Sequence, residues 1–272
     1  MILTEIVWNV KPEIFRLDWF AVRWYGLFFA AAFYFGYLII DKFFKNENIA
    51  DSVLDKLTIY MAVGTIAGAR LGHCLFYQPD YYLANPFDII KIWEGGLASH
   101  GAAVGILFSL WLFSKKTNTG YLWIVDRIVV VVALSGLFIR MGNLMNSEIY
   151  GHPTTLPWGF TFVRDVETFK NATGQAIPCH PTQIYEALAY FAIFGFLLNY
   201  YWKHKGIVKE GFMTGFFLIT LFTVRFFVEF LKNNQVGFES TMILNMGQLL
   251  SIPFIIIGIY LVYKSFKTPI QE

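Results

Sequence analysis

The chain has 272 residues, of which 56% are hydrophobic, 19% aromatic and only 15% charged. Soluble domains carry about 25% charged residues, so this composition excludes most soluble enzymes and indicates that lipid solvates much of the surface. The formal net charge is +2 and the basic residues are scattered along the chain, which argues against a nucleic-acid partner.

Seven apolar stretches approach the roughly 20 residues that a helix needs to cross the hydrocarbon core of a bilayer. They lie near Trp19–Ile40, Leu57–Tyr77, Gly96–Phe113, Tyr121–Met141, Ile184–Trp202, Gly211–Leu231 and Ile243–Tyr263. These runs are apolar all round, whereas the strands of a membrane barrel are shorter and alternate in polarity. We therefore expect an all-α polytopic membrane protein, with residues 1–272 forming a single integral membrane domain of about seven transmembrane helices.

Glycines recur every four residues in the second and third stretches, at Gly64, Gly68 and Gly72 and again at Gly101 and Gly105. Small residues at this spacing let helix backbones approach closely in lipid. The pattern favours helix packing over ligand contact.

The loops on the two sides of the membrane differ in their lysine content. One set carries Lys42, Lys45, Lys56, Lys115, Lys116, Lys203, Lys205, Lys209, Lys264 and Lys267. The short loops of the opposite set carry only Lys91 and Lys232. Lysine-rich loops face the cytosol, so the bias predicts a cytosolic C-terminus and an external N-terminus. The N-terminal segment lacks a basic region before an apolar run, and we expect no cleaved signal peptide.

The longest connection, residues 142–182, is polar, contains Gly and Pro, and is predicted to be an external loop or arm. Cys179 lies in it and Cys74 lies in the second stretch. Their spacing fits neither a metal site nor a redox motif. Free thiols are favoured, and one disulfide stays arithmetically possible.

Polar residues of the membrane stretches gather at their outer ends. They are Arg23, Trp24, Tyr25, Arg70, His73, His100, Arg140, Asn143, Asn146, Glu186, Arg225, Glu229 and Gln248. Only Asp126 and Arg127 lie near the cytosolic end, where a local charge pair explains them. A transporter needs polar groups near the midplane and a route to both surfaces, so this one-sided distribution favours an enzyme of the outer leaflet. The surplus of arginines indicates an anionic substrate such as a phospholipid head group.

Three of these residues are candidates for chemistry, each with a structural alternative. His100 follows Gly95-Gly96, and its imidazole can accept a proton from a thiol or hydroxyl or can serve as a structural hydrogen bonder. Arg140 and Arg225 can clamp a phosphate with their guanidinium forks. They can equally pair with Glu148 or with Glu229, which lies four residues after Arg225.

The most specific motif of the sequence is the run Arg140-Met141-Gly142-Asn143-Leu144-Met145-Asn146-Ser147-Glu148-Ile149-Tyr150-Gly151. Six further segments extend from the first stretch to the last: Arg23–Gly26, Gly68–Gly72, Gly95–Gly101, His180–Glu186, Arg225–Glu229 and Gly247–Pro253. Taken together and in this order, these motifs resemble those of the prolipoprotein diacylglyceryl transferase family.

The resemblance implies a multi-pass enzyme of the bacterial cytoplasmic (inner) membrane with its active site toward the outer leaflet. Such an enzyme moves diacylglyceryl from phosphatidylglycerol to the lipobox cysteine of a preprolipoprotein and releases glycerol phosphate. It starts lipoprotein maturation and uses no metal or other cofactor; its partners are the lipid, the signal peptide and surrounding membrane lipids. Two other classes stay open, namely another outer-leaflet phospholipid transferase and a transporter of lipid or small solutes.

By the same resemblance, His100, Arg140 and Arg225 are the catalytic residues. His100 accepts the thiol proton or positions the thiol, and the two arginines hold the phosphate. The implied substrate-binding residues are Tyr25, Arg140, Asn143, Asn146, Glu148, Gly151, Arg225 and Glu229. Among them, Glu148 is expected to position an arginine and Gly151 to permit a close turn.

The chain departs from the family pattern at three positions. Ala102 replaces a glycine, Leu221 replaces a frequent tyrosine and His73 stands where a tyrosine is common. Leu221 removes a phenol from the implied site, and we expect this loss to have a small effect.

Overall fold

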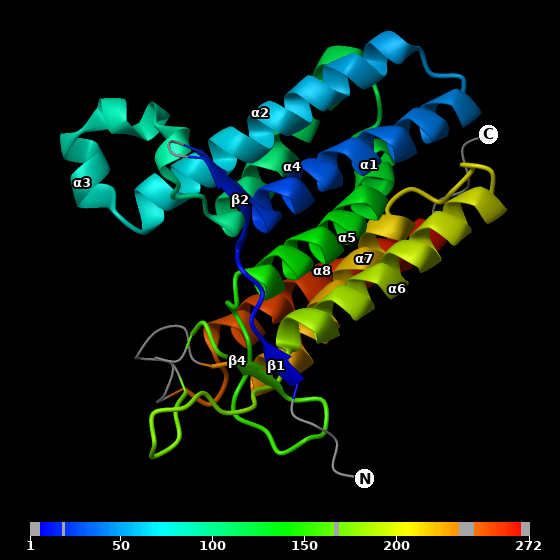
Figure 1. Ribbon diagram of the computed structural model, residues 1–272. Helices are drawn as coiled ribbons and strands as arrows, with labels where there is room; N and C mark the ends of the chain where they lie inside the picture. Colours follow the sequence, from blue (N-terminus) through cyan, green and yellow to red (C-terminus); the bar gives the residue numbers. More distant parts are fainter. Residues whose placement is uncertain (1–5, 18–19, 166–168, 234–241, 268–272) are drawn as a thin grey trace. The chain divides into compact units, whose positions relative to one another are not determined.

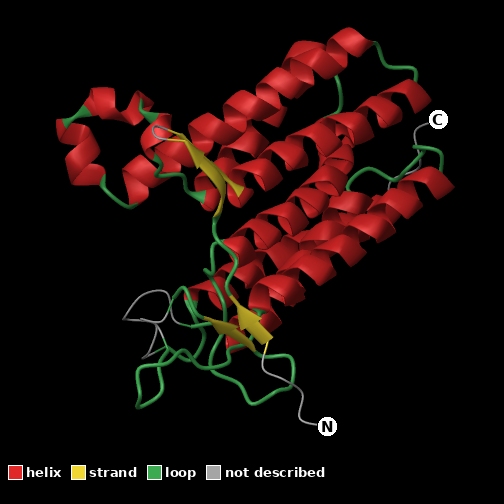
Figure 2. Ribbon diagram, viewed as in Figure 1, coloured by secondary structure: helices red, strands yellow, loops and turns green. Residues whose placement is uncertain are grey.

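The computed structural model describes residues 6–17, 20–165, 169–233 and 242–267 (Figure 1). Helices account for most of them (Figure 2). The long helices are α1 (Trp24–Asn46), α2 (Asp51–Phe76), α4 (Ser99–Thr117), α5 (Tyr121–Met145), α6 (Thr182–Lys203), α7 (Phe212–Val228) and α8 (Met246–Lys267). Short helical turns are α3 (Pro79–Ala84), η1 (Pro86–Ile90), η2 (Ile92–Glu94) and η3 (Glu229–Leu231).

Six helical segments of the described chain are long and apolar enough to cross a membrane, so the chain is a polytopic membrane protein. They are Trp24–Asn46, Asp51–Phe76, Tyr121–Met145, Thr182–Lys203, Phe212–Leu231 and Met246–Lys267.

The remaining predicted stretch, Gly96–Phe113, corresponds to α4, a helix of 19 residues. His100 lies in its first turn and Lys115 and Lys116 lie in its last, so its apolar centre is short. By length and composition α4 is not among the six, and the count of seven stays a prediction.

Four short strands correct the expectation of a purely α-helical chain. β1 (Ile6–Trp8) pairs in parallel with β4 (Phe160–Phe162), and β2 (Glu13–Leu17) pairs antiparallel with β3 (Phe20–Arg23). These strands lie in the segments before α1 and between α5 and α6, where backbone groups need partners outside a helix.

The first membrane stretch was also placed too early in the sequence. Its predicted start, Trp19, lies outside the described residues, and the described helix begins only at Trp24. The N–H of Trp24 donates to the carbonyl of Pro12 at 3.0 Å, which ties the start of the helix to the β2 segment. Arg23 therefore belongs to β3, where 63% of its side chain is exposed, and its assignment to the membrane span was wrong.

Backbone contacts divide the chain into two units, residues 40–127 and residues 1–39 with 128–272. In the first unit, α2 packs on α4 through the predicted glycines. A Cβ on Gly68 would lie 2.5 Å from the carbonyl oxygen of Gly101 and 2.8 Å from the Cα of Gly105. The spacing thus serves close backbone packing, as predicted.

An ion pair lies in the same unit at the position where the sequence predicted a local charge pair. The guanidinium of Arg127 donates to both carboxylate oxygens of Glu47, at 3.1 and 2.9 Å, and lies 4.2 Å from the centre of the Trp123 ring. The sequence identified the arginine but not this partner, 80 residues away.

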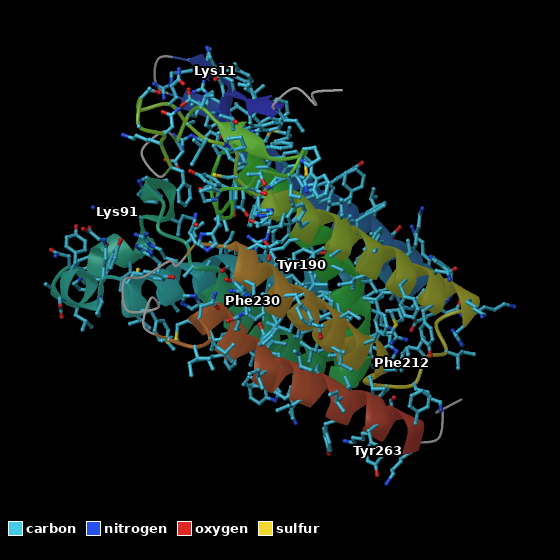
Figure 3. All side chains as sticks on the ribbon, turned by 90° about the horizontal axis from the view of Figure 1, so that it is seen from below. Lys11, Lys91, Tyr190, Phe212, Phe230 and Tyr263 are labelled. Atoms are coloured by element: carbon cyan, nitrogen blue, oxygen red, sulfur yellow. The ribbon has the colours of Figure 1, made fainter. Side chains whose placement is uncertain are left out.

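In the other unit, α7 packs on α8, and α6 lies beside α7 (Figure 3). Gly215 and Gly258 allow the first contact, because a Cβ on either would lie 2.7 or 2.8 Å from the carbonyl oxygen of the other. In the same unit, α1 packs closely on α5, because a Cβ on Gly36 of α1 would lie 2.6 Å from Cγ1 of Val131 in α5.

The segment between α5 and α6 has a small core of its own. Leu144, Tyr150, Phe162 and Cys179 are buried together, and the Tyr150 and Phe162 rings stack 4.4 Å apart. The predicted boundary at residue 142 falls inside α5, which continues to Met145. Both cysteines are free and buried, as expected from their spacing.

We predict that Gly68→Ala lowers the stability of the protein by about 1–3 kcal/mol, because the new methyl group forces α2 away from α4. Thermal unfolding in detergent measures this effect. The matched control is Gly195→Ala in α6, whose added methyl group would meet no atom within 4 Å. Equal melting temperatures for the two variants would show that the glycine packing is not tight.

Candidate functional site

Arg140 forms a buried ion pair with Glu186. Its Nε lies 2.9 Å from Oε2 of Glu186, a fully buried carboxylate in α6. Its Nη1 also donates to Oδ1 of Asn143 at 3.1 Å. The structural partner expected for this arginine was Glu148 or Glu229, so its pairing with Glu186 is a correction. A contact across 46 residues leaves no local spacing signal in the sequence.

Lys232 is a second cation on the same carboxylate. Its Nζ lies 3.0 Å from Oε1 of Glu186 and 3.2 Å from Oε1 of Glu229, with only 3% of the side chain exposed. From its sequence context Lys232 was predicted to be a loop lysine, so its burial in the site was not expected. Its position three residues after Glu229 was the available signal, because the turn η3 brings the two residues together.

Arg225 completes this group from α7. Its Nε lies 3.7 Å from Oε1 of Glu229, the pairing that the four-residue spacing predicted. The side chain of Arg225 is 35% exposed, whereas that of Glu229 is 5% exposed. Arg225 is therefore the most accessible cation of the group.

We call Arg140, Glu186, Lys232, Glu229 and Arg225 the ion network. The three cations and two carboxylates of the network leave a net charge of one positive unit. Most of the side chains in the network are shielded from water. Buried charge is stable only when it is paired and hydrogen-bonded. An added anion with one negative charge would balance the network.

Tyr190 also touches the network and was not predicted. Its hydroxyl donates to Oε1 of Glu186 at 3.4 Å, and the two residues are four apart on α6. Its ring lies against Gly136, where a Cβ would come within 2.7 Å of Tyr190 Cδ2. Figure 3 labels Tyr190 where the ribbons of α6 and α7 run together.

Glu148 organises a set of side-chain amides beside Arg140. Its Oε1 accepts hydrogen bonds from Asn143 at 2.8 Å and from Asn146 at 3.2 Å. Its backbone carbonyl accepts one from Gln183 at 2.7 Å. Glu148 thus reaches the arginine through Asn143, which is consistent with the positioning role expected for it.

The turn that carries Glu148 is strained. Ser147 and Ile149 have φ values of 56° and 59°, a left-handed conformation that is unfavourable for a β-branched residue. Such strain is characteristic of functional sites, where the surrounding contacts hold the backbone.

Gly151 permits a close approach of backbones rather than a left-handed turn. A Cβ there would overlap the carbonyl oxygen of Leu231 and lie 2.9 Å from Cγ2 of Thr182. Its N–H donates to the carbonyl of His180 at 2.8 Å. Gly151 also forms an isolated antiparallel bridge with Lys232, so a side chain here would displace the backbone segment that carries this lysine.

Tyr25 lies against the end of α5. It is the second residue of α1, and a Cβ on Gly142 would lie 2.7 Å from Cδ2 of its ring. Gly142 directly precedes Asn143, so Tyr25 belongs to the same end of the unit as the amides around Glu148.

His100 belongs to the 40–127 unit and not to the unit that holds the ion network. It is the second residue of α4, and its side chain is exposed. Its ring contacts Phe76 edge-on at 5.5 Å between centroids, and Tyr77 lies 5.8 Å away. Arg140 and Arg225 therefore belong to one network of ion pairs. His100, the third predicted catalytic residue, contacts the aromatic rings of Phe76 and Tyr77 instead.

Arg70 has a structural role in that unit. It is 3% exposed and donates to the backbone carbonyls of Ile89 at 2.9 Å, Asp88 at 2.7 Å and Gly95. These bonds hold the segment that precedes His100. The ring of the nearby His73 stacks on that of Tyr77, with 5.6 Å between the ring centroids.

Among the described residues, no group of three or more His, Cys, Asp or Glu side chains is placed to hold a metal ion.

Comparison with known proteins identifies the family. Residues 12–264 match the family model of prolipoprotein diacylglyceryl transferase. The chain belongs to this family. It is similar to the phosphatidylglycerol–prolipoprotein diacylglyceryl transferase of Porphyromonas gingivalis, with 45% identity over 98% of this chain and 97% of that protein. The proteins of the same name from Tolumonas auensis and Chloroherpeton thalassium are 44% and 43% identical, and each match covers at least 95% of both chains.

The match confirms the resemblance predicted from the motifs, which all fall within the matched residues. It also fits the six candidate spans, because the matched region includes nearly all of them.

We predict that Glu186→Gln destabilises this transferase by about 3–5 kcal/mol, because it leaves Arg140 and Lys232 without their shared counter-charge. The measurement is thermal or denaturant unfolding in detergent. Glu210→Gln, which changes an exposed carboxylate, is the control and should behave like wild type. A wild-type melting temperature for Glu186→Gln would contradict the ion network.

Proposed function

We propose that this chain transfers the diacylglyceryl group of phosphatidylglycerol to the cysteine thiol of a preprolipoprotein lipobox. A carbon–sulfur bond forms at the glyceryl carbon, and the bond from that carbon to the phosphate oxygen breaks. Glycerol phosphate leaves with the electron pair, and the thiol proton is removed. The observation that carries this proposal is the family match over residues 12–264, together with a buried cationic network suited to a phosphate.

The ion network supplies the phosphate site in this proposal. Arg225 makes one long contact with Glu229 and retains exposed donors, so it can bind a phosphodiester oxygen directly. Arg140 is more tightly held and lies deeper. Positive charge fixed in place before the reaction stabilises the charge that develops on the leaving phosphate.

The amides around Glu148 orient the head group, and Tyr25 and Gly151 shape the same end of the unit. Asn143 links Glu148 to Arg140, so the head group and the phosphate are positioned by one connected set of hydrogen bonds. Glu229 acts on the substrate through Arg225.

His100 acts on the acceptor thiol. The thiolate is the nucleophile, so a group that accepts the proton or orients the thiol accelerates the attack. The exposed imidazole beside Phe76 and Tyr77 is accessible to a peptide side chain.

The proposed setting is a bacterial cytoplasmic membrane, with seven helices including α4, an external N-terminus and a cytosolic C-terminus. The lysine distribution supports this orientation. In this proposed orientation the α5–α6 segment and the active site face the outer leaflet, where the preprolipoprotein signal peptide is presented.

We predict that Arg225→Lys reduces transfer by about 10²–10³-fold, because the ammonium keeps the charge but loses the fork that holds the phosphate. His100→Ala should also reduce transfer strongly while the protein still inserts into membranes. The assay uses purified protein, labelled phosphatidylglycerol and a lipobox peptide, and it detects the thioether-linked lipid.

The control for this assay is Arg16→Lys, an exposed arginine outside the network, which should retain full transfer. No lipidated peptide with the wild-type protein would refute the proposed function. A different labelled product would indicate another phospholipid transferase, and solute counterflow without covalent turnover would indicate a transporter.

We predict that cysteines introduced at Asp80 and Ala172 react with an impermeant maleimide in intact cells, whereas one at Lys116 reacts only after permeabilisation. All three positions are exposed: Asp80 precedes α4, Lys116 lies in its last turn, and Ala172 follows α5. The native background is low because both native thiols are buried, and burial raises the pKa of Cys179 to about 11. Labelling of Lys116→Cys in intact cells alongside Asp80→Cys would show that α4 does not cross the membrane.

A further inference from the structure

Three buried amide oxygens have no hydrogen-bond partner among the described residues: Oε1 of Gln183, Oδ1 of Asn146 and Oδ1 of Asn233. The first two belong to amides held by Glu148. Gln183 is fully buried at the start of α6. Neither oxygen is explained by the phosphate site, which presents donors rather than acceptors.

The orientation of both amides is fixed by Glu148. The NH₂ group of Gln183 donates to the backbone carbonyl of Glu148 at 2.7 Å, and the NH₂ group of Asn146 donates to its carboxylate at 3.2 Å. Carbonyl and carboxylate oxygens only accept, so turning either amide over would set two acceptors against each other. In each amide, the oxygen is therefore the atom that is left without a hydrogen-bond partner.

A buried acceptor without a donor is unfavourable relative to a satisfied one. Native proteins contain few such groups, and a bound ligand is one reason for their presence. A ligand that satisfies these two oxygens has to bring hydrogen-bond donors.

A series of contacts links the two amides to the cationic end of the site. Gln183 and Glu186 are three residues apart on α6 and therefore share a face. Glu186 pairs with Arg140, and Asn143 links Arg140 back to Glu148. The site thus offers donors for an anion and, beside them, acceptors for donors on the same ligand.

A phosphate ester that carries hydroxyl groups matches this combination. An ethanolamine head group also has donors, but its ammonium would add positive charge beside three cations. A choline head group has no donor hydrogens. The glycerol of a phosphatidylglycerol head group has two hydroxyls and no charge of its own.

We propose that Gln183, together with Asn146, recognises the head-group hydroxyls and thereby selects a glycerol phosphodiester over other lipids of the same charge. This inference rests on the proposed function, because it concerns the lipid donor of that reaction. Gln183 is a specificity-determining residue in this account.

The experiment compares phosphatidylglycerol with phosphatidylpropanol, which has the same phosphodiester charge and chain length but no head-group hydroxyls. For the wild type, we expect kcat/KM to be roughly 10- to 100-fold higher with phosphatidylglycerol, which corresponds to one or two buried hydrogen bonds. Gln183→Met, similar in shape but without the amide, should lose most of this preference, because kcat/KM falls much more with phosphatidylglycerol than with phosphatidylpropanol.

Gln248→Met is the matched control. Gln248 is also a buried amide, but its Oε1 accepts from the N–H of Asn245 at 3.0 Å and its Nε2 donates to Phe226 at 3.4 Å. This variant should keep the wild-type preference between the two lipids.

Equal use of both lipids by the wild type would overturn the inference and would need no variant. An equal loss with both lipids in Gln183→Met would also overturn it, because it would show a structural role only. No transfer by the wild type from either lipid is a different outcome, which refutes the proposed function itself.

Discussion

The organisation of this site depends on one fully buried carboxylate, that of Glu186. Two cations from different parts of the chain share it: Arg140 near the end of α5, and Lys232 just after η3. A buried carboxylate without partners would be strongly unfavourable, so this contact joins α5, α6 and the end of the α7 segment. The same contact holds Arg140 and Lys232 in place and leaves Arg225 as the most accessible cation of the network.

This arrangement separates positioning from binding. Glu186 and Glu229 hold the cations in place, and Glu148 holds the amides. In the proposed reaction these donors are fixed before the lipid arrives, so little reorganisation is needed when charge develops on the leaving phosphate. The strained turn at Ser147 and Ile149 is stabilised by the same hydrogen bonds that orient the site.

Much of the membrane architecture could be predicted from the sequence, because lipid demands long apolar helices and small residues at close contacts. The packing of Gly68 on Gly101 and the pairing of Arg225 with Glu229 follow from spacings of three or four residues. The short strands were not predictable in this way, because a strand such as β4 has only three residues.

The parts of the site that were missed involve contacts between distant residues. Lys232 follows a helical stretch and has the sequence context of an ordinary loop lysine, yet it is buried against Glu186. Whether such a lysine faces water or a carboxylate depends on how the helices pack, which local periodicity does not encode. The resemblance to a family identified Arg140 as important, but only the structure supplied its partner.

The most direct test of this account is the structure of the chain with phosphatidylglycerol bound, determined by electron cryomicroscopy in lipid nanodiscs. The account predicts a phosphate oxygen within about 3 Å of the Arg225 guanidinium. Glu186 should still pair with Arg140 in that complex. A phosphate bound away from this network, with Arg225 contacting only Glu229, would contradict it.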